Sequence, residues 1–366
     1  NAGSPVTLTV GTTNAGAAST FNGIISDGTN PVAVSKAVGT GTMTLAGINT
    51  YSGATTLGAG TLSLTGSAAN SALSMAATTS LNGEGTVASL TTTGATNLAI
   101  NAATPGALTA TGAFTPGSGA VTTVSLTANS TPTSGTVRVL NYGSTTATAA
   151  NFALTGSFRA TSFVVGATST DVLLGSASLT WTGTGGTNWD VNTTSNWNDT
   201  TPAASKFFVA DSVTFDDSPA GTAQTIALTV AVQPASITFN NSTDTYALTG
   251  TAGAIIGTTG ITKNGTANVT LAGGTGQNYT GPIAVNAGTL TMGSATAFGQ
   301  TSGITIASGA AVDINNQTPG TVATGGYAYT IAGNGPTGAG AIVNSTGAGV
   351  ASNAGVKFLT LSANAS

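Results

Sequence analysis

The feature that most constrains the fold of this chain is an internal repeat. The phrase GTMTLAGINTYSGATTLGAGTLSLTG, from Gly41 to Gly66, returns as ANVTLAGGTGQNYTGPIAVNAGTLTMG, from Ala267 to Gly293. Each copy follows an Ile-Ile pair and a lysine, so we define the repeat phrases as residues 36–66 and 263–293. A chain that repeats a short phrase predicts a structure of stacked units that complete one another's core. The recurring positions are Leu45 and Leu271, Tyr51 and Tyr279, Gly53 and Gly281, Gly60 and Gly288, and Leu62 and Leu290.

Short runs of alternating apolar and hydroxyl-bearing residues predict β-strands throughout the chain. In such a run every second side chain points inward, and the Thr or Ser between them points to solvent. Gly, Asn and Asp bound most of these runs and are typical of turns. The 52 glycines also disfavour helices, since each interior Gly costs about 0.5–1 kcal/mol relative to Ala. The clearest runs are Val6–Val10, Thr42–Leu45, Thr61–Leu64, Ser212–Phe215, Ser236–Phe239, Val269–Leu271 and Thr289–Met292.

Repeat and alternation together predict an all-β fold, namely a parallel β-helix or β-solenoid with short rungs. Each rung would stack its inward Val, Leu and Ile side chains on those of the next rung. Because rungs pair through backbone hydrogen bonds, their outward positions can be Thr or Ser almost without limit.

The composition excludes several classes of partner. Charged residues make up 4% of the chain, against roughly 25% in an average soluble domain. Six basic residues and a net charge of −4 leave no electrostatic footprint for nucleic acid. No apolar run approaches the roughly 18 residues of a transmembrane helix, so we expect no transmembrane segment. The absence of cysteine removes disulfides and thiol chemistry.

The first repeat phrase resembles a known family. FNGIISDG from Phe21, then Lys36 and GTMTLAGINTYSGATTLGAGTLSL, are similar to the autotransporter-associated β-strand repeat, also called the passenger-associated transport repeat. LTWTGTGGTNWDVNTTSNWNDT, FFVADSVTFDD, TVRVLNYG and NFALTG resemble segments that accompany such repeats. The resemblance implies a right-handed parallel β-helix in a large bacterial secreted or surface protein. Its location would be extracellular or on the bacterial cell surface.

We expect two solenoid units. Residues 1–176 form the first, and residues 177–366 form the second, which begins with the Trp-containing segment. The chain stops at FLTLSANAS, a strand-like phrase with no cap after it. Since solenoids need polar caps to remain soluble, we interpret the second unit as truncated or continuing beyond residue 366.

The sequence offers little for catalysis. It has no histidine, the usual general base and a common zinc ligand. Asp216 and Asp217 form an acidic pair of the kind that glycoside hydrolysis uses, but Lys206 is the only base near them. We therefore expect no enzymatic activity and no resident cofactor.

Two sets of residues are candidates for binding. Asp211, Asp216 and Asp217 are a weak calcium candidate, because Ca²⁺ takes six to eight oxygen ligands; the alternative is that Asp216 and Asp217 simply end a strand in a turn. Trp181, Trp189 and Trp197 recur at every eighth residue among Asn and Thr, so they could stack on sugar rings. The alternative is that they plug a rung, where large rings bury much area.

The sequence thus favours an extracellular structural protein, a stiff stalk, fibre or filament whose partner is itself. Unpaired edge strands are templates for further pairing, so end-to-end self-assembly is expected. The rival hypothesis is a glycan-binding adhesin, an autotransporter passenger whose Trp181–Trp197 segment contacts a polysaccharide.

Overall fold

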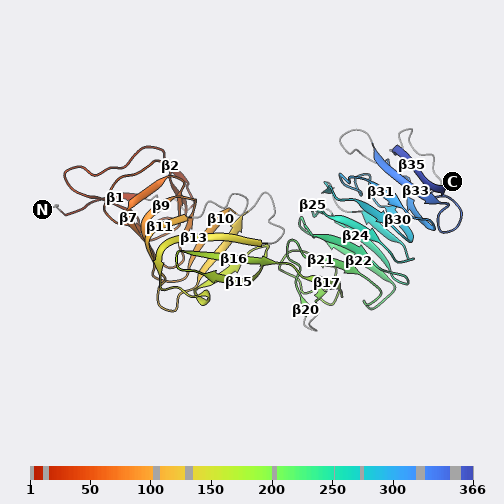
Figure 1. Ribbon diagram of the computed structural model, residues 1–366, viewed down its shortest axis with the longest axis horizontal. Coiled ribbons are helices and arrows are strands. Elements are labelled where there is room, and N and C mark those ends of the chain that lie inside the picture. The colour runs from red at the N-terminus through yellow and green to blue at the C-terminus, as the bar shows by residue number, and fades with distance from the viewer. Residues whose placement is uncertain are drawn as a thin grey trace. The chain divides into compact units, whose positions relative to one another are not determined.

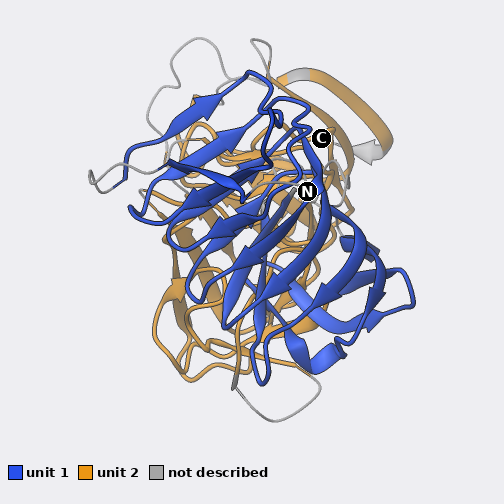
Figure 2. Cartoon of the chain, turned by 90° about the vertical axis from the view of Figure 1, so that its left-hand side faces the viewer, with its two compact units in different colours: residues 1–175 blue, residues 176–366 orange. Residues whose placement is uncertain are grey.

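The computed structural model describes residues 4–10, 16–101, 108–127, 135–199, 204–250, 252–272, 276–318, 326–346 and 356–365. The chain forms two compact units, Asn1–Gly175 and Ser176–Ser366 (Figure 2). Their boundary lies one residue before the one expected from the sequence. Residues 273–275 of the second repeat phrase lie outside the described residues.

Unit 1 consists of two sheets between which the chain alternates (Figure 1). Sheet 1 contains, in spatial order, β1 (Val6–Val10), β3 (Val32–Lys36), β5 (Thr55–Leu57), β7 (Ser67–Met75), β9 (Thr86–Thr92), β11 (Leu108–Thr115), β13 (Gly135–Thr145), β16 (Ser169–Gly175) and β15 (Arg159–Val165). Sheet 2 contains β14 (Phe152–Thr155), β12 (Thr122–Thr127), β10 (Thr96–Asn101), β8 (Ser80–Asn82), β6 (Thr61–Leu64), β4 (Thr42–Leu45) and β2 (Ser19–Phe21).

Unit 2 repeats this plan with two larger sheets and one small one. Sheet 3 contains β20 (Ala204–Ser205), β19 (Trp197–Asn198), β17 (Ser178–Trp181), β21 (Ser212–Phe215), β23 (Ser236–Phe239), β26 (Gly260–Lys263), β29 (Ile283–Val285), β31 (Ile304–Ile306), β33 (Tyr327–Gly333) and β35 (Val356–Ala365). Sheet 4 contains β18 (Asn188–Trp189), β22 (Ala223–Leu228), β24 (Thr245–Thr249), β27 (Val269–Ala272), β30 (Gly288–Met292), β32 (Ala310–Asp313) and β34 (Ile342–Val343). A further sheet joins β25 (Ile256–Gly257) to β28 (Asn278–Tyr279).

The pairing of the strands is that of a β-solenoid. Most strands pair in parallel with the strand that the chain reaches one turn later, as β4 does with β6 and β6 with β8. Within the described residues the only helical element is the short 3₁₀ turn Ala149–Asn151. The prediction of an all-β, parallel solenoid with short rungs is confirmed.

Because the parallel strands pair in register, side chains of the same kind lie beside one another on neighbouring strands and form columns across the sheet. In sheet 3 the inward positions align from Leu179 through Val213, Ile237 and Ile261 to Ile283. All of these side chains are buried, and the Ser and Thr residues between them are not. Burial of each aliphatic side chain stabilises the fold by about 1.5–3 kcal/mol before entropic costs. Because these side chains align from strand to strand, the core is a continuous stack through each unit.

Among the strands that the structure describes, each unit departs from parallel pairing at one place. In unit 1, β16 pairs antiparallel with both β13 and β15. In unit 2, β19 pairs antiparallel with β17 and with β20. In the Trp-containing accessory segment, β19 and β20 therefore extend sheet 3 by antiparallel pairing, while β18 joins sheet 4 in parallel with β22.

Candidate functional site

The repeat positions occupy equivalent places in the two units. The four leucines face inward from β4, β6, β27 and β30, and each is at most 2% exposed. The tyrosines and glycines lie at the corners, where the chain turns from one sheet to the other. Tyr279 is the last residue of β28, Gly288 is the first residue of β30, and the other four lie between strands. These corners, with the lysine that precedes them, are the candidate site; their residues are Lys36, Leu45, Tyr51, Gly53, Gly60, Leu62, Lys263, Leu271, Tyr279, Gly281, Gly288 and Leu290.

Gly53 and Gly281 are glycines because another rung lies against their backbone. A Cβ on Gly53 would lie 2.4 Å from the carbonyl oxygen of Val32, and one on Gly281 would lie 2.3 Å from that of Thr259. Both contacts are far inside van der Waals distance, so any side chain at these positions would push two rungs apart.

Gly60 and Gly288 satisfy two requirements at once. Their φ angles of 68° and 66° lie in the left-handed region, which favours glycine. A Cβ on either residue would also lie 2.5 Å from a carbonyl oxygen of the preceding rung, that of Gly39 or Thr266. Both copies of the repeat therefore have the same backbone conformation at this turn and the same close contact with the preceding rung.

Tyr51 and Tyr279 fill the corner from inside, and neither has any exposed surface. The hydroxyl of Tyr51 is 2.7 Å from Oγ1 of Thr55, and the hydroxyl of Tyr279 donates to the carbonyl oxygen of Ala297 at 3.0 Å. Burial raises the pKa of Tyr279 well above its ordinary value. Both rings therefore act as packing residues whose polar end is satisfied inside the fold.

An amide side chain two residues before each tyrosine supports the corner, and sequence reasoning missed it. Oδ1 of Asn49 accepts the backbone N–H of Ile25 at 2.9 Å, and Oε1 of Gln277 accepts that of Ile255 at 2.8 Å. A shared amide at an aligned position was the available signal. The difference in type, Asn against Gln, concealed it.

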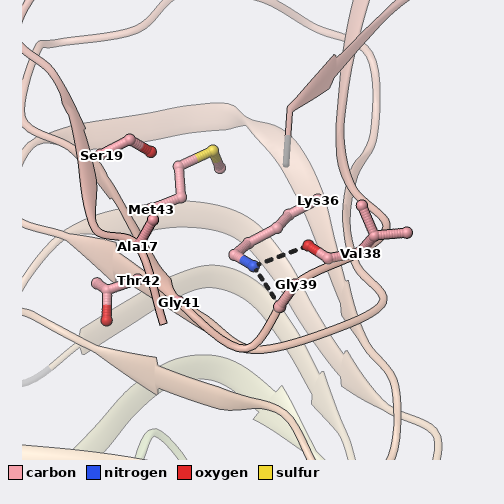
Figure 3. Close-up of a pocket in the computed structure, with 8 residues that line it drawn as sticks. All are labelled: Ala17, Ser19, Lys36, Val38, Gly39, Gly41, Thr42 and Met43. Carbon is pink, nitrogen blue, oxygen red and sulfur yellow. Dashed lines mark hydrogen bonds between the residues drawn. The ribbon is translucent and has the colours of Figure 1, made fainter. Parts of the chain in front are cut away.

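The lysine of the first repeat lies inside the solenoid. Lys36 is 4% exposed and stands between Val10 and Leu57 in an inward column of sheet 1. Its Nζ donates to the carbonyl oxygens of Val38 at 3.3 Å and Gly39 at 3.0 Å (Figure 3). Desolvation lowers the pKa of the amine. The chain thus uses a cation to bind carbonyl groups that a turn leaves unpaired.

Lys263 repeats this arrangement in unit 2. It has no exposed surface and stands between Phe239 and Val285 in sheet 3. Its Nζ donates to the carbonyl oxygen of Gly265 in its own turn, and at 3.4 Å to that of Ala287 in the next rung. Desolvation lowers the pKa of Lys263 to about 8, and the charge of Asp217 opposes this shift.

The three tryptophans, proposed above as glycan contacts, lie in the core instead. Trp181, Trp189 and Trp197 are each at most 1% exposed. Trp181 and Trp189 pack edge-on against Trp197, with ring centroids 5.0 and 5.3 Å away. A sugar cannot stack on a ring face that other rings already cover, so we assign these residues to closing the first rung.

The three aspartates of the calcium candidate accept hydrogen bonds from three different sets of groups. Asp211 is fully buried and accepts the N–H groups of Ala177 at 2.7 Å and Phe208 at 2.8 Å. Asp216 accepts from Ser218 in its own turn. Among the described residues, no three Asp, Glu, His or Cys side chains lie close enough to hold a metal ion. Asp211 therefore binds a turn and the N–H of Ala177, and Asp216 binds a group of its own turn.

Asp217 connects two rungs. Its carboxylate accepts the backbone N–H groups of Ser242, Thr243 and Asp244 at 2.9–3.0 Å. The bonds from Asp244, Ser242 and Thr243 lower the pKa of Asp217 to about 2.

Two more aspartates bind the next rung in a related way, and the sequence did not reveal them. Asp27 accepts the N–H of Ser52 at 3.0 Å and its hydroxyl at 2.6 Å. Asp313 accepts the N–H of Ser345 at 3.1 Å and its hydroxyl at 2.6 Å. Acidic residues are scarce in this chain, and Asp27, Asp217 and Asp313 each bind one rung to a turn or corner of the next, Asp313 from the end of β32.

A comparison with protein families identifies the same two segments of the chain that form the corners. The family model of the passenger-associated-transport-repeat matches residues 37–64 and 261–292. No curated protein and no solved structure matches the chain. The two matched segments cover the corner glycines and tyrosines of both units and most of each repeat phrase. The chain therefore contains two passenger-associated-transport-repeat segments, one in each compact unit.

Proposed function

We propose that this chain is a non-enzymatic structural protein of the extracellular space or the bacterial cell surface. It would act as a stiff stalk, fibre or filament within an autotransporter-type passenger. The single observation that carries this proposal is the unbroken stack of parallel rungs in each unit. The buried lysines and the rung-spanning aspartates form hydrogen bonds within a rung or with the next rung.

The outer surface suits such a role. Outward positions on the strands are mostly Thr, Ser, Asn and Ala, and charged residues make up 4% of the chain. Within the described residues no helix is long and apolar enough to cross a membrane. Short loops and continuous backbone pairing give proteases few extended segments to bind.

End-to-end self-association is supported by the strands at the ends of the sheets. Among the described strands, none pairs with the outer edge of β1 or of β35. Leu8 on β1 is 42% exposed, and Leu361 on β35 is 60% exposed. Next to β1 and β2, Leu8, Phe21 and Met43 line an apolar hollow of about 230 Å³. Unpaired apolar edges of this kind promote pairing with another chain.

The proposal is tested by light scattering and electron microscopy of the purified chain across a concentration series. We expect concentration-dependent rods or fibres. Leu361→Lys places a charge on the β35 edge and should suppress them. Val230→Lys alters an exposed aliphatic side chain, 43% accessible, that lies outside the strands, and should not suppress them. A chain that remains monomeric at all concentrations would refute self-assembly.

The rival adhesin hypothesis has lost the residues on which it rested, because the three tryptophan rings are buried. No other aromatic cluster of the described residues replaces them, since the close ring pairs are formed by buried or partly buried side chains of the core. A glycan array on the purified chain would test the hypothesis independently of these residues.

A further inference from the structure

One outward column of unit 2 consists almost entirely of threonine. It crosses sheet 3 from β17 to β35 and lies next to the inward aliphatic column on each strand. Seven of its eight positions are Thr, and the exception is an alanine on β29. We name it the threonine column; its members, in register, are Thr180, Thr214, Thr238, Thr262, Ala284, Thr305, Thr330 and Thr360.

The spacing of this column is fixed by the backbone. Neighbouring strands of a sheet lie about 4.7–4.9 Å apart, so a hydroxyl and a methyl group recur at that interval. From Thr180 to Thr330 the partners follow one another without a register shift. Threonine is branched at Cβ and restricted at χ1, which limits how far each group can move from its place in the row.

A second outward column runs beside the first. On the three strands β17, β21 and β23 it presents Ser178, Ser212 and Ser236, followed by Gly260 on β26. Three successive strands therefore show the same Ser-x-Thr pattern, with an inward Leu, Val or Ile between the two hydroxyls. The result is a two-dimensional grid of small hydroxyl-bearing side chains.

The chemistry of the grid restricts its ligand. From β17 to β31 neither column contains a charged or aromatic side chain, so the grid offers no ion pair and no ring to stack on a sugar. Within the described residues, the hydroxyls of Thr214, Thr238 and Thr262 form no hydrogen bond with another protein group. They are directed to solvent, and each can both donate and accept. A fitting ligand would be a regular lattice of water.

We propose that the threonine column and its neighbouring serines bind the surface of ice. The oxygen atoms of hexagonal ice repeat along one crystal axis at a distance close to the spacing between strands. A row of hydroxyls at this interval can anchor ordered waters, while the methyl groups occupy the spaces between them. Because the rungs are fixed by stacking, the array is preorganised and loses little conformational entropy on binding.

The test is thermal hysteresis of the purified chain, together with uptake of the fluorescently labelled chain into a growing ice crystal. We expect the unmodified chain to depress the freezing point below the melting point and to enter the ice. Thr238→Lys combined with Thr262→Lys introduces two charges in the middle of the column and should abolish both effects. Circular dichroism verifies that the fold is retained.

Thr270→Lys is the matched control. Thr270 lies on β27, which follows β26 along the chain, and it faces outward from sheet 4 rather than sheet 3. This variant should keep full activity. Thr238→Ser with Thr262→Ser removes only the methyl groups and should weaken hysteresis if the lysine variant fails to fold.

Either of two results would overturn the proposal. The unmodified chain could show no hysteresis and be excluded from ice like an inert protein. Alternatively, Thr270→Lys could lose as much activity as the variants of the threonine column. Neither result bears on end-to-end assembly, which light scattering measures separately.

Discussion

Asp217 and Ser242 lie in turns of successive rungs of unit 2, and the carboxylate of Asp217 accepts the backbone N–H of Ser242 at 2.9 Å. The two neighbouring N–H groups, of Thr243 and Asp244, donate to the same carboxylate. One exposed side chain thereby accepts hydrogen bonds from three successive backbone N–H groups in a turn of the next rung.

This arrangement predicts acid sensitivity of unit 2. The pKa of Asp217 is about 2 in the folded chain against an ordinary value of 3.8. A lowered carboxyl pKa contributes stability that is present above pH 4 and is lost as the pH falls toward 2. Denaturant unfolding between pH 7 and pH 2 should therefore show a steeper acid loss for the unmodified chain than for Asp217→Asn.

Asp216→Asn is the control for that experiment. The carboxylate of Asp216 accepts from Ser218 within its own turn. The hydroxyl of Tyr246 in the next rung binds only the backbone carbonyl of Asp216, which asparagine keeps. Substitution of Asp216 should reduce the stability of unit 2 at pH 7 less than Asp217→Asn does. Equal losses from the two variants would contradict a rung-spanning role for Asp217.

Lys263 predicts a dependence of the same sign at alkaline pH. Its pKa falls from 10.5 to about 8 on folding, so between these values the unfolded chain binds a proton that the folded chain does not. Stability should rise with pH over this window, by up to about 3 kcal/mol at 1.36 kcal/mol per pKa unit. The rise should be absent in Lys263→Met, measured as the difference between the two unfolding free energies at each pH. A constant difference from pH 7 to pH 10 would refute the prediction.

Gly288 should tolerate alanine poorly. Ala at this position meets both a φ of 66° and a carbonyl oxygen 2.5 Å from its Cβ. Gly309 has a similar φ of 81° but nothing within 4 Å of the place where a Cβ would lie. Gly309→Ala should cost about 1 kcal/mol, the usual strain of a left-handed alanine, and Gly288→Ala clearly more. Thermal unfolding of both variants separates backbone strain from the clash between rungs.

The role of Trp189 in the core predicts a large stability effect. The ring is fully buried against Trp197, Phe207 and Phe215, so Trp189→Ala should destabilise unit 2 by about 3–5 kcal/mol. Nε1 of Trp189 has no hydrogen-bond partner among the described residues. Trp189→Phe removes this buried, unpaired N–H and should cost much less than the alanine variant. Unfolding in denaturant measures both, and a neutral Trp189→Ala would show that the ring is not part of the core.

Much of the fold could be predicted from local alternation. The runs Thr42–Leu45, Ser212–Phe215 and Ser236–Phe239 are strands with these same bounds. Their inward and outward faces also follow the predicted period of two. The periodicity succeeded because each of these three strands buries one face only, so its pattern is visible without knowledge of its partners.

The direction of pairing was not visible in the same way. β16 alternates like any other strand, yet it pairs antiparallel with β13 and β15, whereas β13 pairs parallel with β11 on its other side. Alternation identifies which side chains are buried, but it does not state the direction of the neighbouring strand. The tryptophans illustrate a related limit, because Asn and Thr around Trp189 and Trp197 indicated a polar loop, whereas the rings themselves fold inward.

The buried lysines could be predicted in part from the sequence. In the run Val32–Lys36, Val34 and Lys36 occupy the same face, and the structure buries both. Strict application of the period would have placed the lysine inside. The sequence does not show why a lysine is stable inside the core, because the carbonyl groups that bind Nζ come close to it only when the turn is folded.

The strands of each solenoid pair in register, and every rung meets only the rung below it and the rung above. A gene that duplicates or deletes one complete rung would leave all the remaining contacts intact. By contrast, insertion of a single residue within a strand would exchange its buried and exposed faces. Such a protein can change its length in evolution by whole turns, and its two units, each with one copy of the same phrase, are consistent with growth by duplication.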